Sequence, residues 1–110
     1  AVIELGTVVN PDNTRAQVEG SAVMALTAAI KGGITFDKGA TVQSNFHNNP
    51  LVRINEMPKV EVHILANGGS KIKGVGEPGL PPFAPALCNA IFAATGKRIR
   101  RLPFDINKIV

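Results

Sequence analysis

The chain has 110 residues, of which 45% are hydrophobic and 18% are charged, and it contains neither tyrosine nor tryptophan. This length and composition are typical of one packed domain and argue against a disordered segment. The net charge is +4, and four of the cations lie close together at Lys97, Arg98, Arg100 and Arg101. The only cysteine, Cys88, excludes an internal disulfide and a cysteine-based zinc or iron–sulfur site held by this chain alone.

The start of the sequence and its apolar runs give a further expectation. No apolar run approaches the length of a membrane span, and no basic-then-apolar leader opens the chain. The first residue is Ala1, and apolar, strand-like residues follow it at once. We therefore expect a piece of a longer polypeptide.

The first predicted elements are a strand and a helix. Residues 2–9 are rich in valine, isoleucine and leucine and indicate a strand with a bend at Gly6, which the turn-forming residues 10–13 end. The helix should begin at Thr14 and end near Lys31. Thr14 and Gln17 have the spacing of a capping box, in which each side chain satisfies one backbone N–H of the first helical turn.

This helix has a stripe of mostly small apolar residues, which we expect to face the core. They are Val18, Ala22, Ala25, Leu26 and Ala29. Gly20 and Ser21 add further small residues in the second turn, although glycine costs about 1 kcal/mol relative to alanine inside a helix. We therefore expect another surface to pack tightly against this turn.

The middle of the chain predicts short strands and ordered loops. Residues 34–36 and 40–43 flank Asp37-Lys38-Gly39, a hairpin signal with glycine where a positive φ is needed. Residues 45–50 are rich in asparagine, which can bond its own backbone, and indicate an ordered loop. Residues 60–65 alternate in polarity and predict a half-buried strand.

One carboxylate, Glu77, stands inside a run of glycines and prolines at residues 74–82. Glycine permits close backbone approach and proline fixes φ. The run therefore predicts a loop whose shape matters and which presents Glu77 instead of burying it. A positioned catalytic base would be mounted in this way, and so would the carboxylate of an ordinary tight turn.

A second helix is predicted from Pro85 to about Thr95, because proline suits the first helical turn and Gly96 suits the position after the end. Its core-facing residues should be Leu87, Ile91 and Ala94. Together these elements predict one compact α+β unit without repeats or linkers.

Residues 74–79 also match the nucleotide-binding pattern G-x-G-x-x-G. That pattern requires a preceding strand, a helix that opens inside it and an acidic residue about 20 positions later. The prolines within residues 78–82 block such a helix, and the basic pair Lys97-Arg98 occupies the later region. We therefore expect no dinucleotide-binding loop here.

Two other groups of residues favour ordinary structural roles. His47, His63 and Cys88 lack the spacing of a metal site, so we assign no metal ligand. The basic cluster from Lys97 to Arg101 has the charge of a nucleic-acid patch, but it has no stacking aromatic residue beyond Phe104. A solvated helix end, or a contact with acidic groups of a partner, is the favoured interpretation, and no nucleic acid is expected as a partner.

Several segments that span nearly the whole chain, in order, carry a resemblance to a known family. They are Val8-Val9-Asn10-Pro11, Ala16-Gln17-Val18-Glu19-Gly20, Gln43-Ser44-Asn45-Phe46-His47, Glu56-Met57-Pro58, Glu61-Val62-His63-Ile64, Gly74-Val75-Gly76-Glu77-Pro78-Gly79 and residues 89–100. In these segments the chain resembles the C-terminal part of the molybdopterin-binding large subunit of the xanthine oxidase family. Within the family it is most similar to the isoquinoline 1-oxidoreductase beta subunit and related aldehyde dehydrogenases.

The resemblance implies a fold and roles for four residues. The fold is the C-terminal part of the molybdenum-cofactor-binding domain, with two main helices packed on short strands. Glu77 is implied as the catalytic base, which takes a proton from a molybdenum-bound hydroxyl while an N-heterocycle is hydroxylated or an aldehyde is oxidised. Gln17, Gly20 and Gly76 are implied as cofactor-binding residues. Since Gln17 cannot serve fully both as a helix cap and as a cofactor ligand, we favour the cofactor role.

The resemblance also implies cofactors and partners. The cofactor is molybdenum–molybdopterin, in the cytosine dinucleotide form, shared with other chains or with segments absent here. Iron–sulfur clusters would lie on a small partner subunit, because their cysteines are absent from this chain. The remainder of the large subunit is the second implied partner, so the isolated chain is expected to be inactive. The substrate and the compartment, bacterial periplasm or cytoplasm, stay open.

The chain departs from the family pattern at Leu5, where relatives often carry cysteine, and at Asn49, where they often carry tyrosine. Cys88 stands in a helix position that is usually small and apolar. An alternative from a different class of protein therefore stays open, a non-catalytic structural or interaction domain that kept the fold of the enzyme's tail.

Overall fold

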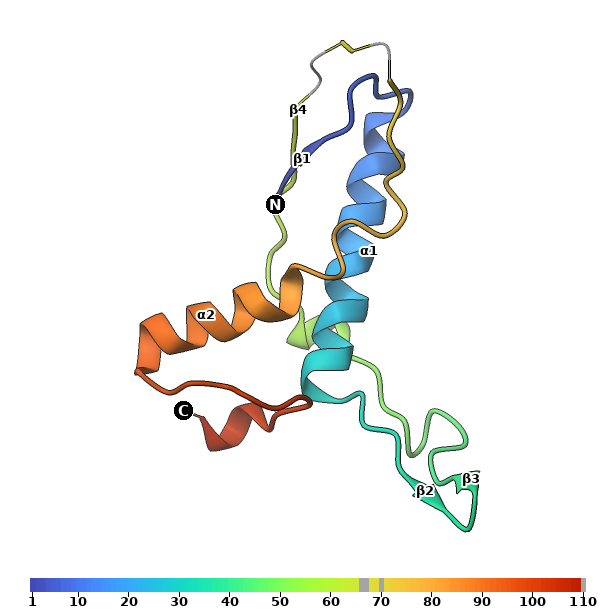
Figure 1. Cartoon of the computed structure of the whole chain (residues 1–110), viewed down its shortest axis with the longest axis vertical. Helices are drawn as coiled ribbons and strands as arrows, with labels where there is room; N and C mark the ends of the chain where they lie inside the picture. Colours follow the sequence, from blue (N-terminus) through green and yellow to red (C-terminus); the bar gives the residue numbers. More distant parts are fainter. Residues whose placement is uncertain (66–67, 70, 110) are drawn as a thin grey trace.

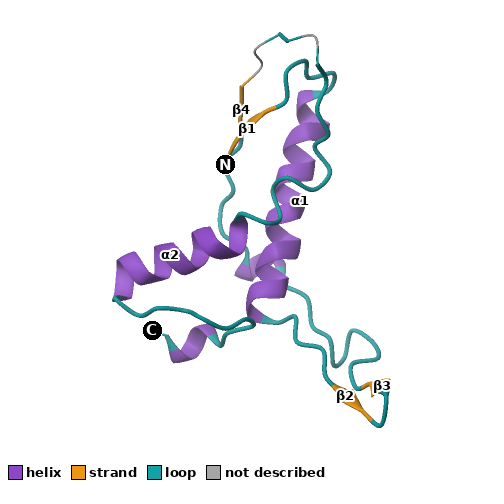
Figure 2. Ribbon diagram, viewed as in Figure 1, coloured by secondary structure: helices purple, strands orange, loops and turns teal. Residues whose placement is uncertain are grey.

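The computed structural model describes residues 1–65, 68–69 and 71–109. In chain order its elements are β1 (Val2–Glu4), α1 (Pro11–Ile30), β2 (Phe36–Asp37), β3 (Ala40–Thr41), a 3₁₀ turn η1 (Ile54–Glu56), β4 (His63–Leu65), α2 (Phe83–Thr95) and a second 3₁₀ turn η2 (Ile106–Lys108). The expectation of an α+β fold is confirmed. Figures 1 and 2 show α1 as the central element, with α2 extending from beside its middle.

Helix α1 begins earlier than the sequence predicted. Asn10 is its N-cap, and the Asn10 side chain accepts a hydrogen bond from the Asn13 N–H at 3.0 Å. Pro11 follows in the first turn, where its missing N–H costs nothing. The Thr14 hydroxyl donates to the Asn10 carbonyl at 3.0 Å, so the predicted capping box of Thr14 and Gln17 is wrong. Asparagine is at least as good a cap as threonine, and this frees the Gln17 side chain.

The core lies along α1. All five residues of the predicted stripe, Val18, Ala22, Ala25, Leu26 and Ala29, are buried. They are joined in the core by Leu5, Val52, Val62 and Ile109. The helices α1 and α2 contact each other more extensively than either contacts a strand. The predicted fold, with two main helices packed on short strands, is therefore confirmed only in part, because the two helices pack mainly on each other.

The strands form two separate two-stranded sheets. In one, β1 and β4 are parallel, with Val2 opposite His63. In the other, β2 and β3 form the predicted antiparallel hairpin, whose turn has φ of 47° at Lys38 and 82° at Gly39. Both β1 and β4 are shorter than predicted. The first strand ends because Gly6, with φ of 72°, bends the chain, and a Cβ there would overlap the Lys71 carbonyl oxygen.

Helix α2 also differs from the prediction in its start and in its burial. It begins at Phe83, two residues before Pro85, and Gly96 ends it in the left-handed conformation with φ of 72°, as predicted. Leu87 and Ile91 are half-buried, Ala94 is exposed, and no residue of α2 is buried. The prediction for Ala94 is therefore wrong, because α1 covers only the start of one face.

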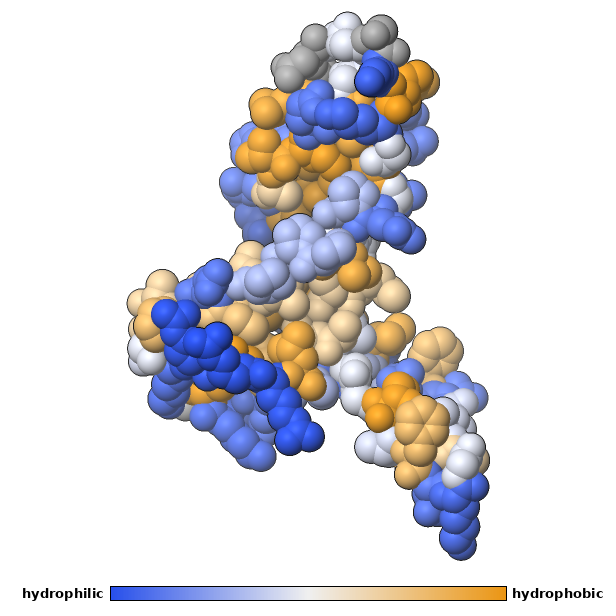
Figure 3. All heavy atoms as spheres, viewed as in Figure 1, coloured by the Kyte–Doolittle hydropathy of each residue, from blue (hydrophilic) through white to orange (hydrophobic). Residues whose placement is uncertain are grey.

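The expectation of a compact unit is wrong. The radius of gyration is 16.7 Å, whereas a compact domain of this length has one of about 13 Å. The accessible surface is 7928 Å², about 2,000 Å² more than a compact protein of this mass exposes. Much of this surface is apolar, as the orange regions of Figure 3 show, and exposed large hydrophobic residues include Val9, Phe36, Phe46, Ile54 and Ile72. The sequence pattern could not reveal this, because an apolar residue has the same place in a sequence pattern whether the fold buries it or leaves it exposed.

Candidate functional site

The Glu77 loop ends in a tight turn. The Leu80 N–H donates to the Glu77 carbonyl at 3.0 Å, and Pro78 and Gly79 occupy the two central positions. Gly79 is not among the described glycines with positive φ, so backbone freedom does not explain it. A Cβ built on Gly79 would overlap the Ser21 hydroxyl oxygen and lie 3.1 Å from the Ser21 Cβ. Gly79 is therefore needed for close approach to α1.

Ser21 supplies a fixed surface for this contact. It is 8% exposed, and its hydroxyl donates to the Val18 carbonyl at 2.7 Å. A Cβ on Gly20, by contrast, would meet no described atom within 4 Å. The predicted tight packing against this turn of α1 is thus present at Ser21 and absent at Gly20.

The other end of the loop is tied to β1. Lys73 Nζ forms an ion pair with Glu4, and the Lys73 N–H donates to the Leu5 carbonyl at 3.2 Å. The Glu4 carboxylate also accepts from the Gly6 N–H at 2.9 Å. The hydrogen bond from Lys73, and then the one from Gly6, hold the pKa of the Glu4 carboxyl below its ordinary value. The loop is therefore anchored before Gly74 and after Glu77.

Between these anchors, Glu77 is presented to solvent. Its side chain is exposed and makes no hydrogen bond or ion pair with any described residue. Gly74 and Gly76 also have open space where a Cβ would stand. The sequence expectation of a presented carboxylate agrees with this geometry.

The residues expected to bind a cofactor lie near the docked loop. Gln17 directly precedes Val18, whose Cα would lie 3.8 Å from a Cβ on Gly79. Gln17, Gly20 and Gly76 are all exposed, and the Gln17 side chain makes no hydrogen bond within the described part of the chain. The structure therefore brings the Glu77 loop to the helical turn that holds Gln17 and Gly20, although no hydrogen bond joins Glu77 to Gln17.

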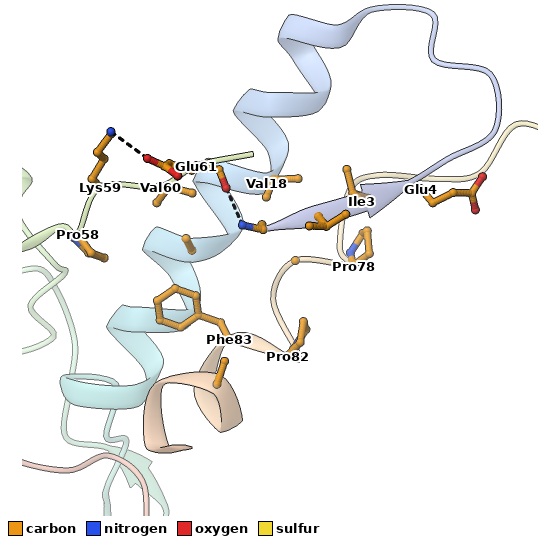
Figure 4. Close-up of a pocket in the computed structure, with 15 residues that line it drawn as sticks. Ile3, Glu4, Val18, Pro58, Lys59, Val60, Glu61, Pro78, Pro82 and Phe83 are labelled. Atoms are coloured by element: carbon orange, nitrogen blue, oxygen red, sulfur yellow. Dashed lines mark hydrogen bonds and ion pairs between the residues drawn. The ribbon is translucent and has the colours of Figure 1, made fainter. Parts of the chain in front are cut away.

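A groove that sequence reasoning missed lies beside this contact (Figure 4). It has a volume of about 570 Å³ and is lined by β1, by Val18 and Ala22 of α1, by residues 58–61, by Pro78 and Gly79, and by the start of α2. Its walls are mostly apolar, and Glu77 is not among them. The parallel pairing of β1 with β4, and the hydrogen bond from the Ala1 amine to the Glu61 carbonyl at 2.6 Å, bring residues 58–61 here. No local signal in the sequence predicts a pairing across some sixty residues.

Within the residues that the structure describes, no group of three or more His, Cys, Asp or Glu side chains is arranged to hold a metal ion. Among the helices described, none has the length and apolar character needed to cross a membrane.

No family model matches the chain, but individual proteins do. It is 34% identical over 101 residues to isoquinoline 1-oxidoreductase subunit beta of Brevundimonas diminuta, covering 92% of the chain and 13% of that protein. It is 35% identical over 102 residues to a membrane-bound aldehyde dehydrogenase of Gluconacetobacter polyoxogenes, whose name assigns pyrroloquinoline quinone to it, covering 93% of the chain and 13% of that protein. It is 32% identical over 117 residues to the aldehyde oxidoreductase molybdenum-binding subunit PaoC of Escherichia coli K12, covering all of the chain and 16% of that protein.

Solved structures show the same fold. The fold matches a Cu,Mo-containing carbon monoxide dehydrogenase with a TM-score of 0.79 and 26% identity, over 98% of this chain and 15% of that one. It also matches quinoline 2-oxidoreductase from Pseudomonas putida 86 with a TM-score of 0.83 and 21% identity, over 98% of this chain and 15% of that one.

These comparisons relate the chain to one segment of larger oxidoreductase subunits. More narrowly, it is related over nearly its whole length to a segment of the molybdenum-binding subunits of the xanthine oxidase family, and the resemblance predicted from the sequence is confirmed. The chain spans 13 to 16% of the length of the relatives named above.

Proposed function

We propose that this chain is the base-bearing part of a molybdenum hydroxylase that hydroxylates an N-heterocycle or oxidises an aldehyde. The observation that carries the proposal is the mounting of Glu77, whose loop is tied to β1 through Lys73 and to α1 through Gly79, with the carboxylate left exposed between the two anchors. A base must be held within hydrogen-bond reach of the proton that it removes. Two anchors serve that requirement better than one flexible turn would.

The proposal places this chain in a larger assembly. A surface about 2,000 Å² larger than that of a compact protein of this mass supports burial against other polypeptide. A sheet of two parallel strands, β1 and β4, supports it too, because parallel sheets are normally covered on both faces. We assign the chain to the C-terminal part of the cofactor-binding domain, beside the remainder of the large subunit and an iron–sulfur small subunit. Without them the isolated chain is inactive.

The exposed groups near the loop fit a molybdopterin cofactor. The Gln17 amide has both donors and an acceptor to offer, and the open space at Gly20 and Gly76 lets a ligand approach the backbone closely. We infer that these three residues hold the cofactor, in its cytosine dinucleotide form. When bound, molybdenum–molybdopterin supplies the centre that accepts two electrons from the substrate.

Glu77 has one task in this scheme. A carboxylate oxygen of Glu77 accepts the proton that is released as oxygen transfer to the substrate begins, and later returns it to solvent. Because Glu77 is exposed on this chain, the walls that exclude water from it belong to the parts of the assembly outside these residues. The apolar groove beside Pro78 and Gly79 provides a surface for those walls.

Metal and cofactor analysis of the native assembly tests this class of function. We expect molybdenum and a pterin to co-purify with the chain in equal amounts. An assembly that contains neither would contradict the proposal and favour the alternative, a structural domain without chemistry. Pyrroloquinoline quinone in place of molybdenum would contradict it as well.

A further inference from the structure

The segment after α2 carries a row of arginines along that helix. Arg98, Arg100 and Arg101, with Ile99 and Leu102, form one wall of a groove of about 390 Å³, and Ala84, Pro85, Cys88 and Asn89 of α2 form the other. Figure 3 shows a strongly hydrophilic band over this C-terminal region. No carboxylate lines the groove.

The positive charge of the chain is concentrated here. Residues 1–77 contain seven Lys or Arg and seven Asp or Glu, whereas residues 78–110 contain five cations and a single acid, Asp105. Asp105 already pairs with Lys108 at 3.6 Å and accepts from the Asn107 N–H at 3.0 Å. None of the ion pairs found among the described residues involves Arg98, Arg100 or Arg101, and residues 78–110 carry the whole net charge of +4.

The arginine segment is held in place. The Arg98 guanidinium lies 3.5 Å from the centre of the Phe92 ring, and Ile99 is half-buried between its charged neighbours. At one end Gly96 closes α2, and Lys97 Nζ donates to the Ile109 carbonyl at 2.9 Å. A side chain that is already ordered, as that of Arg98 is, loses less conformational entropy when it binds.

We propose that this groove is a docking site for an acidic protein surface, whose Asp and Glu carboxylates pair with Arg98, Arg100 and Arg101. Guanidinium groups match carboxylates in two-point hydrogen bonds. Nucleic acid fits less well, because no aromatic residue lines the groove to stack on a base. The inference rests on the larger assembly proposed above but is independent of any catalytic role of Glu77.

Carbodiimide cross-linking of the native assembly tests the proposal directly, since this reagent joins a carboxylate to an amine in contact with it. In the variant Arg100→Lys, we expect the introduced amine to be linked to an Asp or Glu outside residues 1–110, identified by mass spectrometry. The link between Lys73 and Glu4 is the internal control, because the structure pairs those groups. Formation of the control link without a link at position 100, or a link there only to Asp105, would overturn the proposal.

Charge reversal gives a second, independent measurement. We expect Arg98→Glu/Arg100→Glu to weaken assembly at least about tenfold, with a loss that shrinks as salt rises. Arg98→Lys/Arg100→Lys keeps the charge but not the two-point hydrogen bonds, so it should cause a smaller loss. The matched control is Lys38→Glu, at the exposed tip of the β2–β3 hairpin. If the charge-reversal variant assembled as tightly as Lys38→Glu, the proposal would be contradicted. It would also be contradicted if nucleic acid were bound to the wild-type assembly and absent from the charge-reversal variant.

Discussion

Gly79 lies directly against Ser21 of α1, so closely that a Cβ at position 79 would overlap the Ser21 hydroxyl oxygen. Ser21 cannot easily give way, because its hydroxyl donates to the Val18 carbonyl at 2.7 Å and its side chain is buried. This contact sets the position of the loop two residues after Glu77. With the tie between Lys73 and Glu4, it explains how an exposed carboxylate can be held in place.

The first prediction concerns this contact. Gly79→Ala should displace the loop and destabilise the assembly by about 1–3 kcal/mol, the usual cost of overpacking, with a fall in activity at unchanged molybdenum content. Ser21→Ala removes the overlapping oxygen but leaves the Ser21 Cβ 3.1 Å from the added one, so Ser21→Ala/Gly79→Ala should recover part of the loss. Thermal melting and turnover of the three variants measure this. Gly74→Ala, where the added Cβ meets open space, is the control, and an equal loss there would refute the account of Gly79.

The second prediction concerns the pH dependence of the Lys73 anchor. The lowered pKa of Glu4 means that the folded state favours the ionised carboxylate. The stabilisation is therefore complete above the ordinary glutamate value of 4.5 and is lost as the pH falls through the lowered folded value. Lys73→Met should reduce the melting temperature at neutral pH, and its gap to wild type should narrow under acid conditions. A gap that is constant with pH would show that the ion pair contributes nothing.

The third prediction separates two roles of the α1 N-terminus. Asn10→Ala removes the observed cap and should cost about 1 kcal/mol of stability. Gln17→Ala should leave stability nearly unchanged, because Gln17 does not cap the helix, and should reduce retention of the cofactor during purification. Melting temperature and molybdenum content, measured on both variants, test the two halves. A large stability loss for Gln17→Ala with full cofactor retention would reverse the assignment.

Local signals in the sequence predicted much of the fold. The buried stripe of α1, the hairpin with Gly39 at positive φ and the end of α2 at Gly96 all follow from spacing and from glycine conformation. The start of α1 was missed because Thr14 and Asn10 both suit an N-cap, and only the structure shows that Asn10 takes that position.

The remaining features depend on contacts between distant residues. The parallel pairing of Val2 with His63 leaves no local trace, and neither does the contact of Gly79 with Ser21. The sequence did indicate close packing near Gly20, and the structure moves that packing by one residue. Glu77 was recognised as presented from its glycine and proline neighbours, whereas its proposed chemistry, like that of Gln17, came from the resemblance to a family. The exposure of many apolar residues could not be predicted either, because the sequence pattern of an apolar residue does not show whether the rest of the fold covers it.

Turnover of Glu77→Gln in the complete assembly is the most direct test of the central claim. The substitution keeps the shape of the side chain and removes its basicity, so we predict a loss of at least about a hundredfold in turnover, with molybdenum and molybdopterin content unchanged. Asp37→Asn, which removes an exposed carboxylate on the remote β2–β3 hairpin, should retain full activity. Turnover of Glu77→Gln within about twofold of wild type, far from the expected contribution of a catalytic base, would contradict the assignment.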